Sequence, residues 1–113
     1  MPAYVIAHLR QPGTADDEVY EYLERIQATL DPFEGRFLIH GGRTRVLEGS
    51  WPGGTVMLEF PDFAAAEAWY ASAAYREILR LRTDHMVGDV ILAEGCGPDH
   101  DSAAMAAELR AAG

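Results

Sequence analysis

Two spacings of apolar residues alternate along this chain and predict its secondary structure. Runs that are rich in β-branched and aromatic residues predict four strands, over residues 3–9, 35–40, 54–60 and 86–94. Between these runs the apolar residues recur every three or four positions, which is typical of amphipathic helices. We expect the first helix to begin at Thr14 or Ala15, and the second to follow an N-cap at Asp62.

The order of these elements is strand, helix, strand, strand, helix, strand. This order predicts an α+β fold of the ferredoxin-like type, in which two helices cover one face of a four-stranded antiparallel sheet. We expect one ferredoxin-like domain over residues 1–97. Residues 98–113 form a C-terminal tail, which is either a short alanine-rich helix capped at Asp101 or Ser102, or disordered.

The predicted sheet has a second face that no helix covers. Several apolar side chains point to it, namely Tyr4, Ile6, Met57 and Ile91. A face of this kind is too apolar to remain in full contact with water. We therefore expect two copies of the chain to press these faces together and form a symmetric homodimer.

Composition and charge exclude several classes of function. The chain has 113 residues, nine arginines, no lysine and a formal net charge of −9 at pH 7. An acidic chain lacks the clustered cations that bind nucleic acid or an anionic membrane surface, and a chain without lysine cannot form a Schiff base through a lysine amine. Neither a membrane span nor a signal peptide is recognisable. We expect a cytoplasmic protein.

Residues that bind metals are few and scattered. Cys96 is the single cysteine, which excludes an intramolecular disulfide framework and a cysteine-based metal site. The four histidines show no close ligand spacing: His8, His40, His85 and His100. We therefore expect no metal and no other cofactor.

Several ordered motifs resemble those of the DUF1330 family. They are "GGRTRVLEGSW" at residues 41–51, "MLEFPDF" at 57–63 and "WYASAAYREILRLR" at 69–82. The resemblance covers residues 3–95 and implies the fold of the dimeric α/β-barrel superfamily. It implies no particular reaction, although related dimeric barrels include cofactor-free monooxygenases, isomerase-like enzymes and haem-dependent enzymes. Likeness of fold alone is weak evidence of function.

One end of the predicted sheet gathers candidate catalytic residues. His8 lies where the first strand ends, and antiparallel pairing places Asp89 of the last strand beside it. An imidazole suits proton transfer near neutral pH, and a carboxylate can orient it. His40 and Arg43 belong to the same end of the sheet, and we expect their side chains to converge with His8 at one mouth of the barrel. The alternative is a structural His8 that bonds to a backbone carbonyl.

Further candidates surround a ligand-binding mouth or lie at the opposite one. Cationic and aromatic side chains suit an anionic or aromatic ligand, and the candidate substrate-binding residues are His40, Arg43, Arg36, Trp51 and Tyr4. Glu59 is a third candidate catalytic residue. It points to the open face if Leu58 faces the helices, and it then acts as a base or pairs with Arg36. Removal of the initiator methionine would add the secondary amine of Pro2 as another possible base.

Two hypotheses for function remain. In the first, the dimer is a cofactor-free enzyme that performs acid–base chemistry, of the isomerisation, cyclisation or lyase type, on a small acidic or aromatic carbonyl compound. In the second, the domain is a non-catalytic module for ligand binding or assembly. An enclosed pocket favours the enzyme, and an interior filled by side chains favours the module.

Overall fold

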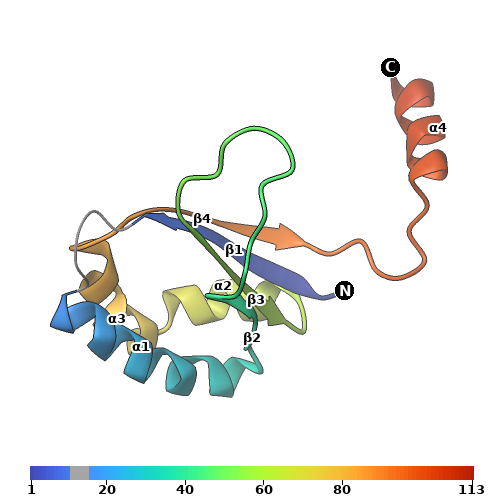
Figure 1. The fold of residues 1–113 in the computed structure, drawn as a ribbon. Helices are drawn as coiled ribbons and strands as arrows, with labels where there is room; N and C mark the ends of the chain where they lie inside the picture. Colours follow the sequence, from blue (N-terminus) through green and yellow to red (C-terminus); the bar gives the residue numbers. More distant parts are fainter. Residues whose placement is uncertain (11–15) are drawn as a thin grey trace.

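A computed structural model describes residues 1–10 and 16–113 of the chain (Figure 1). Its elements follow in the order β1 (Ala3–Arg10), α1 (Asp17–Leu30), the 3₁₀ helix η1 (Asp31–Phe33), β2 (Arg36–His40), β3 (Gly54–Phe60), α2 (Phe63–Ala71), α3 (Ala73–Thr83), β4 (Val87–Glu94) and α4 (Ser102–Ala112). The predicted start of the first helix at Thr14 or Ala15 falls outside the described residues. The predicted order of strands and helices is confirmed.

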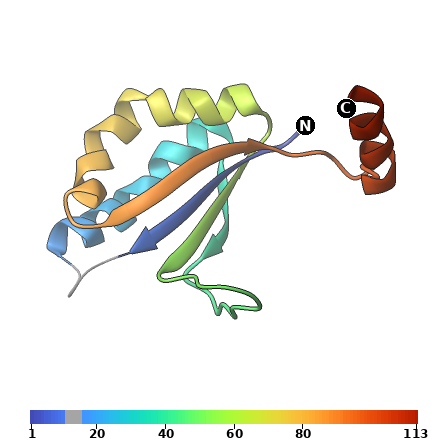
Figure 2. The same ribbon diagram turned by 90° about the horizontal axis from the view of Figure 1, so that it is seen from above.

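The four strands form one antiparallel sheet in the order β2-β3-β1-β4. Helices α1, α2 and α3 all lie on one side of this sheet, as Figures 1 and 2 show. The predicted ferredoxin-like α+β fold is therefore confirmed. Within the described residues, none of the helices combines the length and the apolar character needed to cross a membrane.

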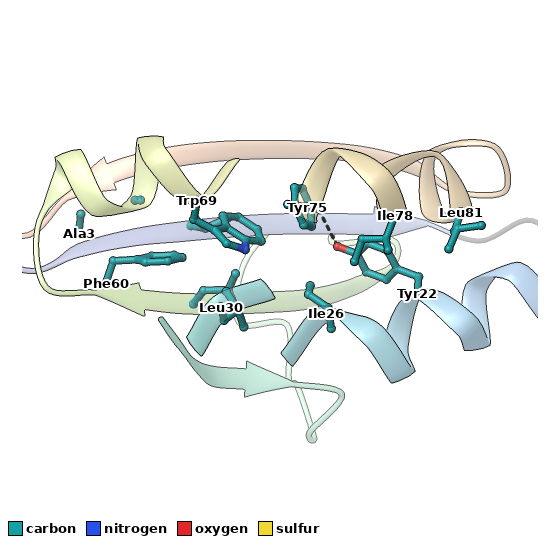
Figure 3. Close-up of a cluster of buried hydrophobic side chains, with 12 residues drawn as sticks. Ala3, Tyr22, Ile26, Leu30, Phe60, Trp69, Tyr75, Ile78 and Leu81 are labelled. Atoms are coloured by element: carbon teal, nitrogen blue, oxygen red, sulfur yellow. Dashed lines mark hydrogen bonds between the residues drawn. The ribbon is translucent and has the colours of Figure 1, made fainter. Parts of the chain in front are cut away.

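The core lies between the sheet and the helices (Figure 3). Alternate residues of the strands point into it, because successive side chains of a strand lie on opposite faces. The largest fully buried side chains are Trp69, Tyr75, Phe60, Leu30 and Ile78. The buried indole N–H of Trp69 donates to the Thr29 hydroxyl at 3.0 Å, so this polar group is paired inside the core.

Short polar side chains mark where the helices begin. Asp62 caps α2 and Asp101 caps α4, each by accepting a hydrogen bond from a backbone N–H of the first turn. Asp16 caps α1 in the same way. Ser72 ends α2 and caps α3, which explains why the helical region from residue 63 to residue 83 is divided in two.

Two parts of the chain lie outside the layer of sheet and helices, and the sheet itself has one face that no helix covers. The open face of the sheet exposes Ile91 by 56%. The β2–β3 loop (residues 41–53) extends from the sheet on the side away from the helices, and α4 lies beyond the end of β4, separate from the rest of the molecule (Figures 1 and 2). The radius of gyration is accordingly 16.6 Å, where a compact chain of this length has about 13 Å.

The N-terminal end of α1 is joined to the C-terminal end of α3 by a histidine–carboxylate contact. His85 Nε2 lies 2.8 Å from Glu18 Oε1 and 3.6 Å from Asp16 Oδ1, and Arg80 donates to the other Glu18 oxygen at 3.1 Å. The hydrogen bond to Glu18 raises the pKa of His85, and the bonds from His85 and Arg80 lower the pKa of Glu18. Each shift favours the charged form of its own group, so the contact is strongest when both His85 and Glu18 are ionised.

This contact predicts a pH dependence of stability. The raised pKa of His85 means that its contribution is complete below the unfolded pKa and is lost as the pH rises through the folded one. The lowered pKa of Glu18 means that its contribution is lost as the pH falls through its folded pKa. As the pH rises above about 6.5, the melting temperature of the wild type should therefore fall further than that of His85→Gln. If the melting temperatures of the two proteins change equally with pH, the contact between His85 and Glu18 does not stabilise the fold.

Candidate functional site

A cavity of about 400 Å³ lies between the sheet and helices α1 and α3. Apolar side chains form most of its wall, among them Val5, Ile26, Leu58 and Val90. Exposed residues also line it, at the ends of the β2–β3 loop and on α1, so the cavity reaches the surface there. Its size and its largely apolar wall are those of a small-molecule site.

Three polar side chains meet in the wall of this cavity. The hydroxyls of Tyr22 and Tyr75 share a hydrogen bond of 2.7 Å, drawn as the dashed line in Figure 3. The guanidinium of Arg82 lies over the Tyr22 ring, 5.6 Å from its centre. Tyr22 comes from α1, whereas Tyr75 and Arg82 come from α3, two turns apart on its buried side. The packing of α1 against α3 therefore creates this group, which we call the Tyr–Tyr–Arg group.

Arg82 is a buried cation, with 6% of its surface exposed. Among the described residues, none of the ion pairs involves it. Burial lowers its pKa, but the neighbouring oxygens of Tyr22 and Tyr75 outweigh this effect and the pKa ends above the ordinary value. The site therefore keeps a full positive charge beside an apolar cavity.

Tyr22 is held in its neutral form. Burial raises the pKa of its phenol far above the ordinary value, and the neighbouring Tyr75 raises it further, while Arg82 lowers it only in part. A phenol in this state can donate a hydrogen bond but cannot serve as a base near neutral pH. The Tyr–Tyr–Arg group is therefore suited to bind an oxyanion.

His40 lines the same cavity from the end of β2. Its ring stacks on Phe37, with centroids 4.2 Å apart. Residues three apart on a regular strand point to opposite faces, but β2 has a register shift between Phe37 and Ile39, which turns both rings toward the helices. The predicted convergence of His40 with His8 is wrong for this reason, because the two side chains lie on opposite faces of the sheet.

His8 and Asp89 pair in register on the open face, as predicted. Arg10 lies between their side chains: it contacts His8 Nδ1 at 3.0 Å and Asp89 Oδ2 at 3.1 Å. Asp89 therefore reaches His8 only through Arg10, and its role in orienting His8 stays a prediction. Trp51 of the β2–β3 loop stacks on His8, 4.4 Å between centroids, and His8 Nε2 is buried without a hydrogen-bond partner among the described residues. His8 is covered by the loop and does not line the cavity.

The remaining candidates also lie outside the cavity. Arg36 forms an ion pair with Glu59 on the open face, with Arg36 Nη2 2.6 Å from Glu59 Oε1, and Tyr4 pairs with Glu59 in register on the neighbouring strand. Arg43 is exposed in the β2–β3 loop. Of the residues selected from the sequence, the structure places only His40 at the cavity, and the roles of the others remain predictions. Pro2 precedes β1, at the other end of that strand from the cavity mouth.

One group of possible metal ligands lies at the end of α3. A ligand atom from each of Asp16, Glu18 and His85 lies within 4.8 Å of the others. The Arg80 guanidinium is already bonded to Glu18, and its positive charge opposes the binding of a metal cation there. The group is better described as the ion-pair cluster that joins α1 to α3.

Tyr22, Tyr75 and Arg82 are not among the candidates chosen from the sequence, although the sequence contains a signal for them. Tyr75, Ile78 and Arg82 are spaced by three and four residues, so they share one side of a helix. An arginine on an otherwise apolar side is uncommon unless its charge has a use. The partner helix could not be identified from spacing alone.

Comparisons with known proteins support the fold. The family described as a domain of unknown function (DUF1330) matches residues 2–96, and a comparison with curated proteins gave no match. A protein of unknown function from Rhodopseudomonas palustris has a TM-score of 0.68 and 16% identity, over 86% of this chain and 84% of that one. A dimeric ferredoxin-like protein of unknown function from Jannaschia sp. CCS1 has a TM-score of 0.66 and 15% identity, and the match covers 84% of this chain and 100% of that one.

A variant of SnoaB, a cofactor-independent oxygenase from Streptomyces nogalater, is also similar. Its TM-score is 0.62 at 13% identity, over 88% of this chain and 98% of that one. Identities this low show a shared fold and nothing more about function.

The hydrogen bond between the two buried tyrosines predicts a coupled loss of stability. Tyr22→Phe and Tyr75→Phe should each lower the free energy of unfolding by about 1–2 kcal/mol, because each leaves the other hydroxyl without this partner. The double variant should lose about 1 kcal/mol less than the sum of the two. Urea unfolding of the four proteins measures this difference, with Tyr20→Phe as a control at an exposed position. If the loss of unfolding free energy in the double variant equals the sum of the two single losses, the two hydroxyls are not coupled.

Proposed function

The chain belongs to the DUF1330 family, and from this premise we propose that it binds a small acidic or aromatic carbonyl compound in the cavity beneath its sheet. We propose further that it is a cofactor-free enzyme, which performs acid–base chemistry on this compound. The observation that carries the proposal is the buried charge of Arg82, which faces an apolar cavity and lacks a carboxylate partner among the described residues.

The cavity wall selects the body of the ligand, and the charge selects its head group. Removing a guanidinium from water is costly unless an anion or several acceptors replace the water. A ligand with a carboxylate, phenolate or enolate oxygen supplies that acceptor, and the fork of N–H groups on arginine matches it. The aliphatic and aromatic residues of the wall accommodate the apolar remainder.

The same arrangement can stabilise an enolate. In the proposed step, a C–H bond next to the substrate carbonyl breaks and its proton passes to the imidazole of His40, which lines the cavity. The electron pair of that bond moves onto the carbonyl oxygen. Arg82 and the neutral hydroxyl of Tyr22 then donate hydrogen bonds to the oxyanion. In a substrate with a conjugated C=C bond, return of the proton to the far carbon of the dienolate completes an isomerisation. In a substrate with a second carbonyl group, the enolate carbon attacks that carbonyl carbon, the C=O π electrons move onto its oxygen, and this oxygen takes the proton back from His40, which completes a cyclisation.

A relative of the same fold lends support to a reaction without a cofactor. SnoaB is described as a cofactor-independent oxygenase, so this fold is compatible with a reaction that needs no cofactor. The alternative is a binding module, in which the Tyr–Tyr–Arg group holds the same ligand and His40 takes no proton.

We also propose that the chain acts as a homodimer. The open face of its sheet bears exposed Ile91 and Val87 beside half-buried Tyr4, Ile6 and Met57. Covering such a face with a second copy removes apolar surface from water. The Jannaschia protein is described as a dimer, which supports this assembly.

Ligand binding can be tested by thermal shift with aromatic carboxylates, phenols and enolisable keto acids. A ligand at 100 times its dissociation constant stabilises the native state by about 2.7 kcal/mol, which corresponds to a shift of about 10 °C. Arg82→Met should weaken binding about 10- to 100-fold, because it removes a charged hydrogen bond and keeps similar volume. The matched control is Arg76→Met, an exposed arginine of the same helix. Binding that survives Arg82→Met unchanged would refute the proposed site.

Catalysis can be separated from binding by hydrogen exchange into the ligand. In D₂O, the wild type should speed deuterium incorporation next to the carbonyl of a bound keto acid, as followed by proton NMR. His40→Asn should slow this exchange about 100-fold or more and leave the thermal shift in place. Binding without any accelerated exchange in the wild type would establish the binding module instead.

A further inference from the structure

Helix α4 has an apolar side that its own chain does not cover. Residues 98–113, which we call the C-terminal arm, are all exposed. Met105 and Leu109 lie one turn apart on α4 and are exposed by 49% and 63%. An isolated helix of 11 residues is only marginally stable in water, because nucleation is costly and few hydrogen bonds repay it. The helix therefore needs another surface to pack against.

The segment that leads into the arm is held against the N-terminus of the chain, and these contacts fix the direction in which the arm leaves the sheet. Gly95 donates a backbone hydrogen bond to Pro2 at 2.8 Å, and the Met1 side chain packs beside Gly97. Beyond this point the chain leaves the sheet and carries α4 clear of the helices and strands, as both views show (Figures 1 and 2).

The β2–β3 loop presents the second uncovered apolar surface. Val46 is exposed by 51% and Leu47 by 81%. The C-terminal end of this loop is held against the sheet. Trp51 stacks on His8, and its indole N–H donates to the Thr55 hydroxyl at 2.8 Å. Because one end of the loop is already held in place, its exposed apolar tip loses less conformational freedom on binding, so it is a preformed docking surface.

The two surfaces have complementary charge. The loop carries two arginines and one glutamate, whereas the arm carries three carboxylates and one arginine. The charged residues concerned are Arg43, Arg45 and Glu48 in the loop, and Asp99, Asp101, Glu108 and Arg110 in the arm. None of these side chains takes part in an ion pair within the described part of the chain. In a chain of net charge −9, the loop is a local cationic surface that suits an acidic helix.

The topology keeps the two surfaces apart within one molecule. The loop joins β3 at Gly54, which pairs with Leu9 at the end of β1, whereas the arm follows Glu94, which pairs with Ala3 at the start of β1. The two attachment points are therefore about 20 Å apart along the strands. When two copies run in opposite directions, the arm of each reaches the loop end of the other, and both contacts form at once.

We infer that α4 of one copy docks on the β2–β3 loop of a second copy, so that two chains exchange arms. Met105 and Leu109 pack against Val46 and Leu47, and the carboxylates of the arm face Arg43 and Arg45. The loop begins at Gly41 and ends at Gly53, and both line the mouth of the cavity. The partner's arm therefore braces the mouth of the site on the other copy.

Cross-linking between two differently tagged chains tests this exchange. Both chains carry Cys96→Ser, one also carries Leu47→Cys and the other Leu109→Cys, and the pair is co-expressed and treated with a short bismaleimide. We expect a covalent heterodimer in high yield. As a control, Tyr20→Cys replaces Leu47→Cys, since Tyr20 is an exposed residue of α1 in the helical layer. Absence of the heterodimer, or equal yield with the control, would overturn the inference.

A second measurement does not depend on cross-linking chemistry. Sedimentation of the full-length protein should show that Leu109→Asp and Leu47→Asp each raise the dimer dissociation constant at least 10-fold, whereas Tyr20→Asp leaves it unchanged. Both leucines are exposed, so circular dichroism should report the same fold in every variant. Dissociation constants equal to that of the wild type for the two leucine variants would also overturn arm exchange.

Discussion

The guanidinium of Arg82 lies beside two tyrosine hydroxyls at the edge of the core, and this buried cation constrains the rest of the site. It requires that α1 and α3 pack closely enough to bring Tyr22 to Tyr75, whose hydroxyls are 2.7 Å apart. It also requires acceptors, because a charge removed from water is costly without them. The two phenol oxygens lie near this charge, and an anionic oxygen bound in the cavity would be a further acceptor for it. Stability and ligand choice therefore depend on the same three side chains.

The fold could be predicted because each of its signals is local. Alternation places Val5 and Leu58 toward the helices, and the period of α1 places Val19 and Ile26 there as well. Asp62 caps α2 because a short carboxylate can reach the free N–H groups of the first turn. These rules act over two to four residues, so the order of the elements and the choice of fold follow from them.

The site could not be predicted in the same way, because it depends on contacts between distant elements and on one irregularity. The register shift after Phe37 turns His40 toward the helices, and an alternating pattern gives no warning of it. Arg10 separates His8 from Asp89, although the backbones pair as expected. The position of Arg82 on the buried side of α3 is visible in the spacing, but its meaning depends on Tyr22, which lies sixty residues earlier in the chain.

The β2–β3 loop connects the two faces of the sheet. Its Trp51 covers His8 on the open face, while its ends at Gly41 and Gly53 line the cavity on the helical face. Gly53 has φ +127° and no room for a Cβ beside the Leu9 carbonyl, so the path of the loop at the mouth is closely defined. The two ends of the loop are therefore also part of the wall of the cavity at its mouth. If a second chain holds that tip, assembly and access to the cavity are physically linked, because the same short segment serves both.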